Sequence, residues 1–107
     1  MAKYLITANY SSDGMKGALA DGGTSRKTAI EALATSVGGS VDAVYFGFGQ
    51  QDVLIICEAP DHVSIAAICM TVVASGATIS TGSIQLLTAE EVDAAAKLSP
   101  AYRAPGA

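Results

Sequence analysis

The sequence contains no tryptophan, one histidine and two cysteines, and aromatic residues make up only 6% of its 107 positions. A surface that stacks nucleic-acid bases needs several aromatic rings, so this composition argues against one. One histidine and two cysteines are also too few ligands for a closed structural zinc site within one chain. We therefore expect no metal site and no cofactor.

Charge is scarce as well. Charged residues make up 15% of the chain, and ten acidic residues against six basic ones leave a net charge of −4 at pH 7. No basic stripe is present, so neither nucleic acid nor an anionic membrane surface is an expected partner. The uncharged segment 63–79 is shorter than the roughly 20 apolar residues that a membrane-spanning helix needs. The first residues do not have the pattern of a signal peptide. We expect a cytoplasmic protein in which Cys57 and Cys69 are reduced and behave as small buried hydrophobic residues, with a redox pair as the alternative.

Half of the residues are apolar, and their spacing predicts alternating strands and helices in one domain over residues 1–107. Strands are expected at 3–10, 41–49, 52–59 and 77–87. Helices are expected from about 12 to 20, at 25–36, at 62–74 and from 89 to about 97, and residues 98–107 should form an extended tail. Asp61 and Thr88 are the expected N-caps of the last two helices. The order β-α-β-β-α-β indicates an α+β, ferredoxin-like fold, with an antiparallel sheet in the strand order 4-1-3-2 and its two main helices on one face.

The two middle strands are apolar on both faces, although helices cover only one face of this fold. We assign Asp52, Leu54, Ile56 and Glu58 to the uncovered face. In the preceding strand, strict alternation would separate Val44, Phe46 and Phe48 from Val41, Ala43 and Tyr45. Burying each large apolar side chain contributes about 1.5–3 kcal/mol, and a monomer rarely leaves such a patch in water. The sequence therefore predicts a homo-oligomer, at least a dimer, in which two sheets pack face to face as an α+β barrel.

Several separated segments are similar to the GYD family of small bacterial and archaeal proteins, named for a Gly-x-Tyr-Asp-type signature. They are KYLITANY, GGTSRKTAIEAL, YFGFGQQDVLIICEAPD and LLTAEEVDAAAKLSPAYRAPG. The resemblance implies a ferredoxin-like fold related to dimeric α+β barrels, and it implies no reaction. Gly49 and Asp52 match the signature, whereas Gln51 stands at the position of its tyrosine. We interpret the motif as structural, with Asp52 hydrogen-bonded to the turn. The alternative is a binding carboxylate or general base.

A concave apolar surface with few polar groups suits a small apolar ligand. The candidate ligand-binding residues are those expected to line the cavity between the two sheets: Thr7, Asn9, Phe46, Phe48, Asp52, Leu54 and Ile56. Dimer packing alone is the alternative role of these residues. We expect a non-enzymatic binding or accessory module. The alternative function is a small cofactor-independent enzyme, of oxygenase or isomerase type, that uses a carboxylate in the cavity. The candidate catalytic residues are Asp52, Glu58 and His62.

Two further features lie outside the expected cavity. Gly23, Thr24, Ser25 and Arg26 could hold an anion at the start of a helix, or Thr24 or Ser25 could simply cap a helix after a break. The tail carries Tyr102 and Arg103 between prolines. It could clasp a neighbouring copy or lie on its own protomer.

Overall fold

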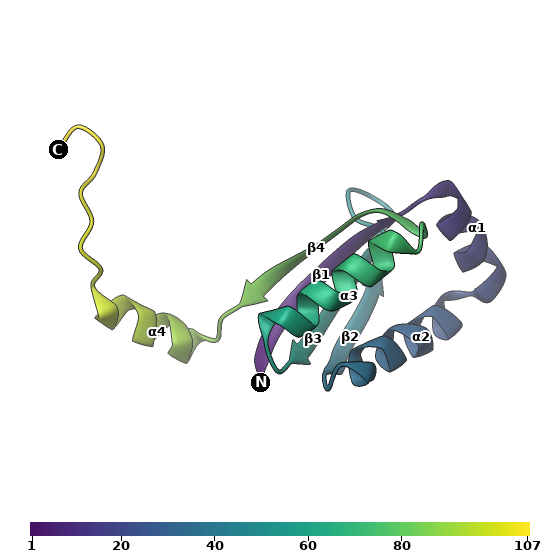
Figure 1. Cartoon of the computed structure of the whole chain (residues 1–107), viewed down its shortest axis with the longest axis horizontal. Helices are drawn as coiled ribbons and strands as arrows, with labels where there is room; N and C mark the ends of the chain where they lie inside the picture. Colours follow the sequence, from purple (N-terminus) through teal and green to yellow (C-terminus); the bar gives the residue numbers. More distant parts are fainter.

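The computed structural model describes all residues from 1 to 107 and has eight elements (Figure 1). In chain order these are β1 (Ala2–Tyr10), α1 (Ser12–Asp21), α2 (Gly23–Ser36), β2 (Ser40–Phe46), β3 (Val53–Ala59), α3 (His62–Ala74), β4 (Thr78–Leu86) and α4 (Ala89–Leu98). The expected order of elements is confirmed. No helix is long and apolar enough to cross a membrane.

The four strands form one antiparallel sheet in the order β2-β3-β1-β4, which confirms the predicted 4-1-3-2 arrangement. In the centre of the sheet, Ile6 of β1 lies opposite Ile55 of β3. Side chains alternate between the two faces of a strand, and directly opposite residues share a face. This register therefore sorts every strand residue onto the helix-covered face or the open face.

The core lies between the helices and one face of the sheet. Strands β1 and β3 contribute Tyr4, Ile6, Ala8, Val53, Ile55, Cys57 and Ala59, and the helices contribute Ile30, Ile65 and Ile68. Only 12 of the 107 residues are buried, because helices α2 and α3 cover one face of the sheet and nothing covers the other. The protomer therefore encloses a small core for a chain of its length.

Polar caps begin three of the four helices. The Asp61 carboxylate accepts a hydrogen bond from the Ser64 amide at 2.8 Å at the start of α3, and the Ser11 hydroxyl accepts one from the Gly14 amide at 3.0 Å at the start of α1. Thr88 and Glu91 form a capping box at the start of α4. The predicted N-caps Asp61 and Thr88 are confirmed.

Helix α2 begins earlier than expected, and the prediction that Thr24 or Ser25 caps it is wrong. Its N-cap is Gly22, which has a φ of 81° and makes no side-chain hydrogen bond. Glycine adopts this left-handed conformation without a steric penalty, so the chain turns at one residue and the helix begins at Gly23. Thr24 and Ser25 consequently lie inside the first turn.

Strand β2 also differs from the prediction, because its register with β3 shifts between Val41 and Ala43. The extra residue returns Val41 to the same face as Val44 and Phe46, and all three pack against the core. The prediction that Val41 lies opposite Val44 is therefore wrong. The strand ends at Phe46 rather than at residue 49.

The C-terminal arm, which we define as residues 87–107, stands away from the rest of the chain (Figure 1). Helix α4 has no buried residue, and Tyr102 is 81% exposed. The radius of gyration of 16.6 Å exceeds the roughly 13 Å of a compact chain of this size because of the arm. The alternative in which the tail lies on its own protomer is wrong.

Candidate functional site

The open face of the sheet is an apolar surface that the helices of the protomer leave uncovered. Strand pairing places Leu5 and Thr7 of β1 on this face, opposite Ile56 and Leu54 of β3. Ile84 of β4 lies opposite Leu5, and Tyr45 of β2 lies opposite Leu54. Tyr45 is 66% exposed and Ile84 is 57% exposed. The expected assignment of Leu54, Ile56 and Glu58 to the open face is confirmed.

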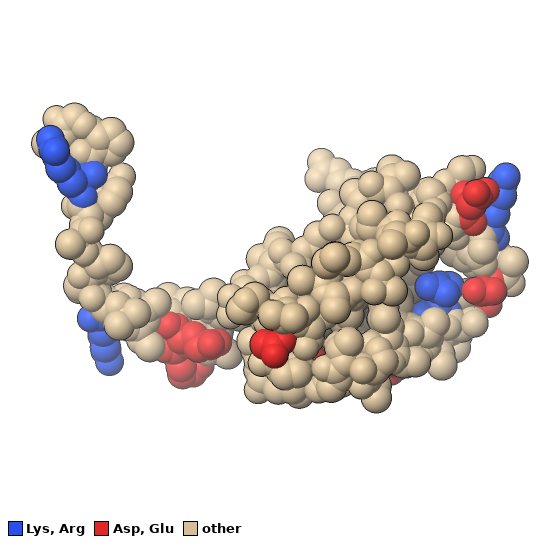
Figure 2. Space-filling view, in the orientation of Figure 1, with Lys and Arg blue, Asp and Glu red and all other residues tan.

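The opposite side of the sheet is covered by helices. Figure 2 shows that most of the molecule seen from this side is uncharged, while charged side chains gather at the α1 end and along the arm. No metal-binding cluster of three or more His, Cys, Asp or Glu residues is present.

Asn9 and Asp52 form a reciprocal pair at the end of the open face where β1 leaves the sheet. The Tyr10 amide donates to Asp52 Oδ2 at 2.9 Å, and the Asp52 amide donates to Asn9 Oδ1 at 3.1 Å. The Asn9 side-chain amide also donates to the Ser80 hydroxyl at 3.1 Å. The pair lies at a shift in the register of β1 with β4. It therefore joins the ends of three strands.

Asp52 thus serves the backbone, but not in the way that we expected. Its carboxylate accepts from the end of β1 rather than from the hairpin turn, which the Gly47 amide closes by donating to the Asp52 carbonyl at 3.0 Å. Gln51, at the signature's tyrosine position, accepts a long hydrogen bond of 3.5 Å from Asn9. Residues of the signature segment therefore link the end of β1 to the start of β3 by hydrogen bonds in this chain.

The three candidate catalytic residues are not brought together. Asp52 and Glu58 lie at opposite ends of β3, roughly 20 Å apart along the strand. His62 is the first residue of α3 and is exposed. Near Glu58, the ammonium group of Lys3 lies 2.8 Å from Asp42, and the hydrogen bond and charge of Asp42 raise the pKa of Lys3. The structure forms no shared acid–base site from these residues.

Phe46 and Phe48 do not line the open face, so their expected position in an inter-sheet cavity is wrong. Phe46 packs against the core on the helix-covered face, and its ring stacks on that of Phe48 with centroids 6.2 Å apart and planes 11° apart. The register of the hairpin causes this placement, because Phe46 lies opposite the buried Val53 and β2 ends at Phe46. Of the seven candidate ligand-binding residues, Thr7, Leu54 and Ile56 share the open face, with Asn9 and Asp52 at its end.

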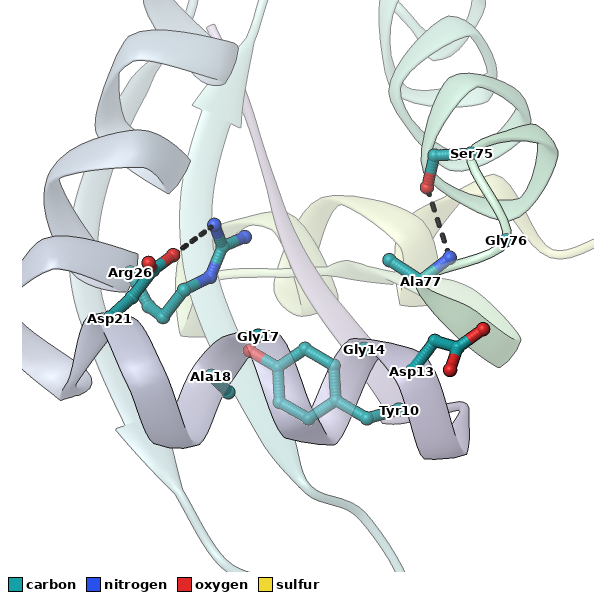
Figure 3. Close-up of a pocket in the computed structure, with 10 residues that line it drawn as sticks. All are labelled: Tyr10, Asp13, Gly14, Gly17, Ala18, Asp21, Arg26, Ser75, Gly76 and Ala77. Carbon is teal, nitrogen blue, oxygen red and sulfur yellow. Dashed lines mark hydrogen bonds and ion pairs between the residues drawn. The ribbon is translucent and has the colours of Figure 1, made fainter.

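The candidate anion site is split by the geometry. Gly23, Thr24 and Ser25 are exposed at the start of α2. Arg26 instead reaches toward a hollow of about 400 Å³ between α1, the start of α2 and the α3–β4 loop (Figure 3). We did not single out this hollow from the sequence. The spacing of Gly14 and Gly17 on one side of α1 was the available signal, because Gly14 leaves no room for a side chain against the Ala77 carbonyl.

Both thiols are free. Cys57 is 1% exposed, and Cys69 is partly buried at the edge of the core. Burial raises the pKa of each thiol, which keeps both protonated and weakly nucleophilic at neutral pH. They pack as small hydrophobic residues.

Comparison with known proteins places this geometry in a wider context. No curated protein matches the sequence. Among solved structures, MtbAldR has a TM-score of 0.53 at 17% identity; the match covers 81% of this chain, which spans about half (52%) of the length of MtbAldR. FFRP-DM1 has a TM-score of 0.52 at 14% identity, with 81% of this chain and 100% of that chain covered. At these identities the likeness establishes the ferredoxin-like fold alone.

The sequence itself matches a protein family over most of its length. The GYD domain is matched by residues 4–96, a range that includes all of the sheet except the first two residues of β1, the Asn9–Asp52 pair and most of α4. All four segments in which we saw the resemblance overlap this range. The chain belongs to the GYD domain family.

Proposed function

We propose that this protein is a homodimeric binding or accessory module, in which two copies pack open face to open face and hold a small apolar ligand between their sheets. The observation that carries the proposal is the one-sided cover of the sheet. Helices bury one face of β1 and β3, while the other face presents Leu5, Leu54, Ile56, Tyr45 and Ile84 to solvent.

Burial of these side chains favours a second copy, but it must exceed the cost of association. Each of these side chains contributes at most about 1.5–3 kcal/mol when it is fully transferred from water. Association costs roughly 4–15 kcal/mol in lost translational and rotational freedom. The open face alone is therefore a modest interface, and a stable dimer needs additional contacts.

The C-terminal arm supplies such contacts in the proposed dimer. An isolated helix of ten residues is only marginally stable in water, even with a good N-cap. Val92 and Leu98 of α4 are 55% and 79% exposed, and no residue of α4 is buried on its own protomer. We place the arm against the second copy, with Tyr102 and Arg103 clasping that neighbour.

The centre of the open face offers space for a ligand within the interface. Thr7 lies opposite Leu54 on one side and opposite Gly82 of β4 on the other. A side chain at Gly82 would meet no atom within 4 Å, so the space beside Thr7 is open on this side. A single hydroxyl among aliphatic side chains suits a small, mostly apolar molecule.

Native mass spectrometry tests both parts of this proposal. Protein purified gently from its host should be a dimer and should carry a reproducible small adduct. Ile84→Lys places a charge on the open face and should raise the dimer dissociation constant at least about tenfold, since burying an unpaired charge costs more than 1.4 kcal/mol. Met70→Lys is the control, because Met70 is 71% exposed on α3, on the other side of the sheet.

The outcomes separate cleanly. A dimer weakened by Ile84→Lys and unaffected by Met70→Lys supports the interface. A wild-type monomer at micromolar concentration, or equal effects of the two substitutions, overturns it. A clean dimer that never carries an adduct removes the ligand from the proposal and leaves an accessory module.

A further inference from the structure

Three of the four hollows in the protomer adjoin at two residues, Tyr10 and Arg26. The first hollow, of about 400 Å³, lies between α1, the start of α2 and the α3–β4 loop (Figure 3). The second, of about 90 Å³, lies between α2 and α3 above the sheet. The third, of about 200 Å³, lies between α1 and the Phe46–Phe48 pair. All three are on the helix-covered side, opposite the face of the proposed dimer.

The guanidinium of Arg26 has only one long ionic contact within the protein at this junction. Its side chain is two-thirds buried, with 33% of its surface exposed, and the one carboxylate oxygen within 4 Å of it is Asp21 Oδ2 at 3.8 Å. That separation is well beyond the roughly 2.7–2.9 Å of a charge-assisted hydrogen bond. A guanidinium has five N–H donors in a planar fork that matches a carboxylate. The donors of Arg26 are thus available to an anion in the adjoining hollow.

The hollow between α2 and α3 is apolar. Most of its lining is aliphatic, with Ile30 and Leu33 from α2, Ile68 and Val72 from α3, and the underlying sheet below them. Between Arg26 and Ile30, helix α2 presents the small side chain of Ala29 to it. The lining of such a hollow lacks contact partners that an apolar group would supply.

The charges around the outer hollow restrict the anion. Asp13 and Asp21 line it together with Arg26, so the hollow carries two carboxylates and one guanidinium, with Asp21 beside Arg26 and Asp13 at the other end (Figure 3). A multiply charged phosphate would be repelled by both acids, whereas a single carboxylate can pair with Arg26 and displace the long contact to Asp21. The site therefore favours a monoanion over a phosphate.

We propose that the junction at Tyr10 and Arg26 binds a small organic carboxylate, with its carboxylate group on the Arg26 guanidinium and its apolar body in the hollow between α2 and α3. This site is separate from the inter-sheet cavity and does not depend on the dimer. It uses the helix-covered side of the sheet, where the protein combines a charged group with an unfilled apolar space.

Octanoate is the probe for this site, because it joins a carboxylate to a short apolar chain. Titrated into the isotope-labelled full-length protein, it should shift the amide signals of Arg26, Ala29 and Ala77. Acetate lacks the apolar chain and octanol lacks the charge. Each should bind at least about tenfold more weakly than octanoate, since each loses an interaction worth 1.4 kcal/mol or more.

Matched substitutions test the two halves of the site. Arg26→Gln should weaken octanoate binding by about ten- to hundredfold, the range expected for a lost charge-assisted hydrogen bond. Its control is Lys27→Gln, the adjacent exposed cation of α2, which should leave binding unchanged. Ala29→Leu should fill the apolar hollow and block the chain, while Ala32→Leu on the exposed surface of the same helix should not.

One further substitution should strengthen octanoate binding rather than weaken it. Asp21→Asn removes the carboxylate beside Arg26 and should tighten octanoate binding severalfold, an effect that a damaged fold would not produce. Circular dichroism of each variant shows that the fold is retained.

The proposal is overturned if octanoate at millimolar concentration shifts no signal, or if Arg26→Gln binds as tightly as the wild type. It is also overturned if the shifts are confined to Thr7, Leu54 and Ile56, since the probe would then occupy the open face. Ile84→Lys distinguishes this site from the proposed dimer, because that variant should lose dimerisation and still bind octanoate.

Discussion

The two faces of the sheet are built from the same strands and differ in what covers them. Along β3, Val53, Ile55 and Cys57 are buried beneath the helices, with 3%, 9% and 1% of their surface exposed. Their neighbours Leu54 and Ile56 are equally apolar but remain only half-buried. A strand with large apolar side chains on both sides needs a cover on both sides. The protomer provides one cover, and the second cover is the role that we propose for another copy of the chain.

The largest expected difference in stability is between substitutions of two neighbouring residues of β1, one on each face of the sheet. Ile6→Ala removes a side chain that is 3% exposed in the core and should lower the free energy of unfolding by about 2–5 kcal/mol. Leu5→Ala removes a half-buried side chain from the open face and should cost much less at concentrations where the protein is monomeric. Chemical denaturation of both variants at low protein concentration measures the difference. Equal losses would mean that the open face is already packed within the protomer.

A smaller loss of stability is expected when the Asn9–Asp52 pair, which joins the ends of three strands, is broken. Asp52→Ala leaves the Tyr10 amide without its acceptor and should cost about 1–3 kcal/mol of unfolding free energy. Asp52→Asn keeps an acceptor oxygen and should recover most of the loss. Denaturant titration distinguishes the variants. Full stability in Asp52→Ala would show that water replaces the carboxylate at no cost.

The smallest expected effect concerns the N-cap of α3, one of the two helices that cover the sheet. Hydrogen bonds from the Ser64 amide and hydroxyl lower the pKa of the Asp61 carboxyl below its usual range. A carboxyl with a lower pKa in the folded state stabilises the fold above its unfolded-state pKa, and this stabilisation is lost as the pH falls through the folded value.

When the pH falls below about 4, protonation of Asp61 should therefore lower the melting temperature of the wild type by a few degrees. Asp61→Asn retains the cap without a titrating group and should show a smaller acid-dependent fall. Thermal melts from pH 7 to pH 3 measure both profiles. Parallel profiles for the two proteins would assign the acid sensitivity to other carboxyls.

The parts of the structure that could be predicted from the sequence rest on local signals. Asp61 after Pro60, and Thr88 three residues before Glu91, mark helix starts within a few residues, and both N-caps are where we expected them. The alternation along β3 likewise fixed which side chains share a face, because that strand has no register shift.

The parts that we missed depend on contacts between distant segments. The shift at Val41–Ala43 arises from pairing with β3 and has no sequence signal that we recognised, yet it moved Val41 to the helix-covered face. The junction at Tyr10 and Arg26 also includes Ala77 from a different part of the chain. Only the tertiary fold brings these three positions to one hollow.

The sheet order has a consequence for how the chain is made. Strand β1 leaves the ribosome before both of its neighbours in the sheet, β3 and β4, which follow α1, α2 and β2 along the chain. Pairing Ala8 with Val53 and with Thr81 closes long loops, and such pairing is slow. A nascent chain that stops before residue 53 contains neither neighbour of β1. The growing chain must therefore hold an apolar strand without a partner until β3 has emerged, and the sheet can be completed only when β4 has followed.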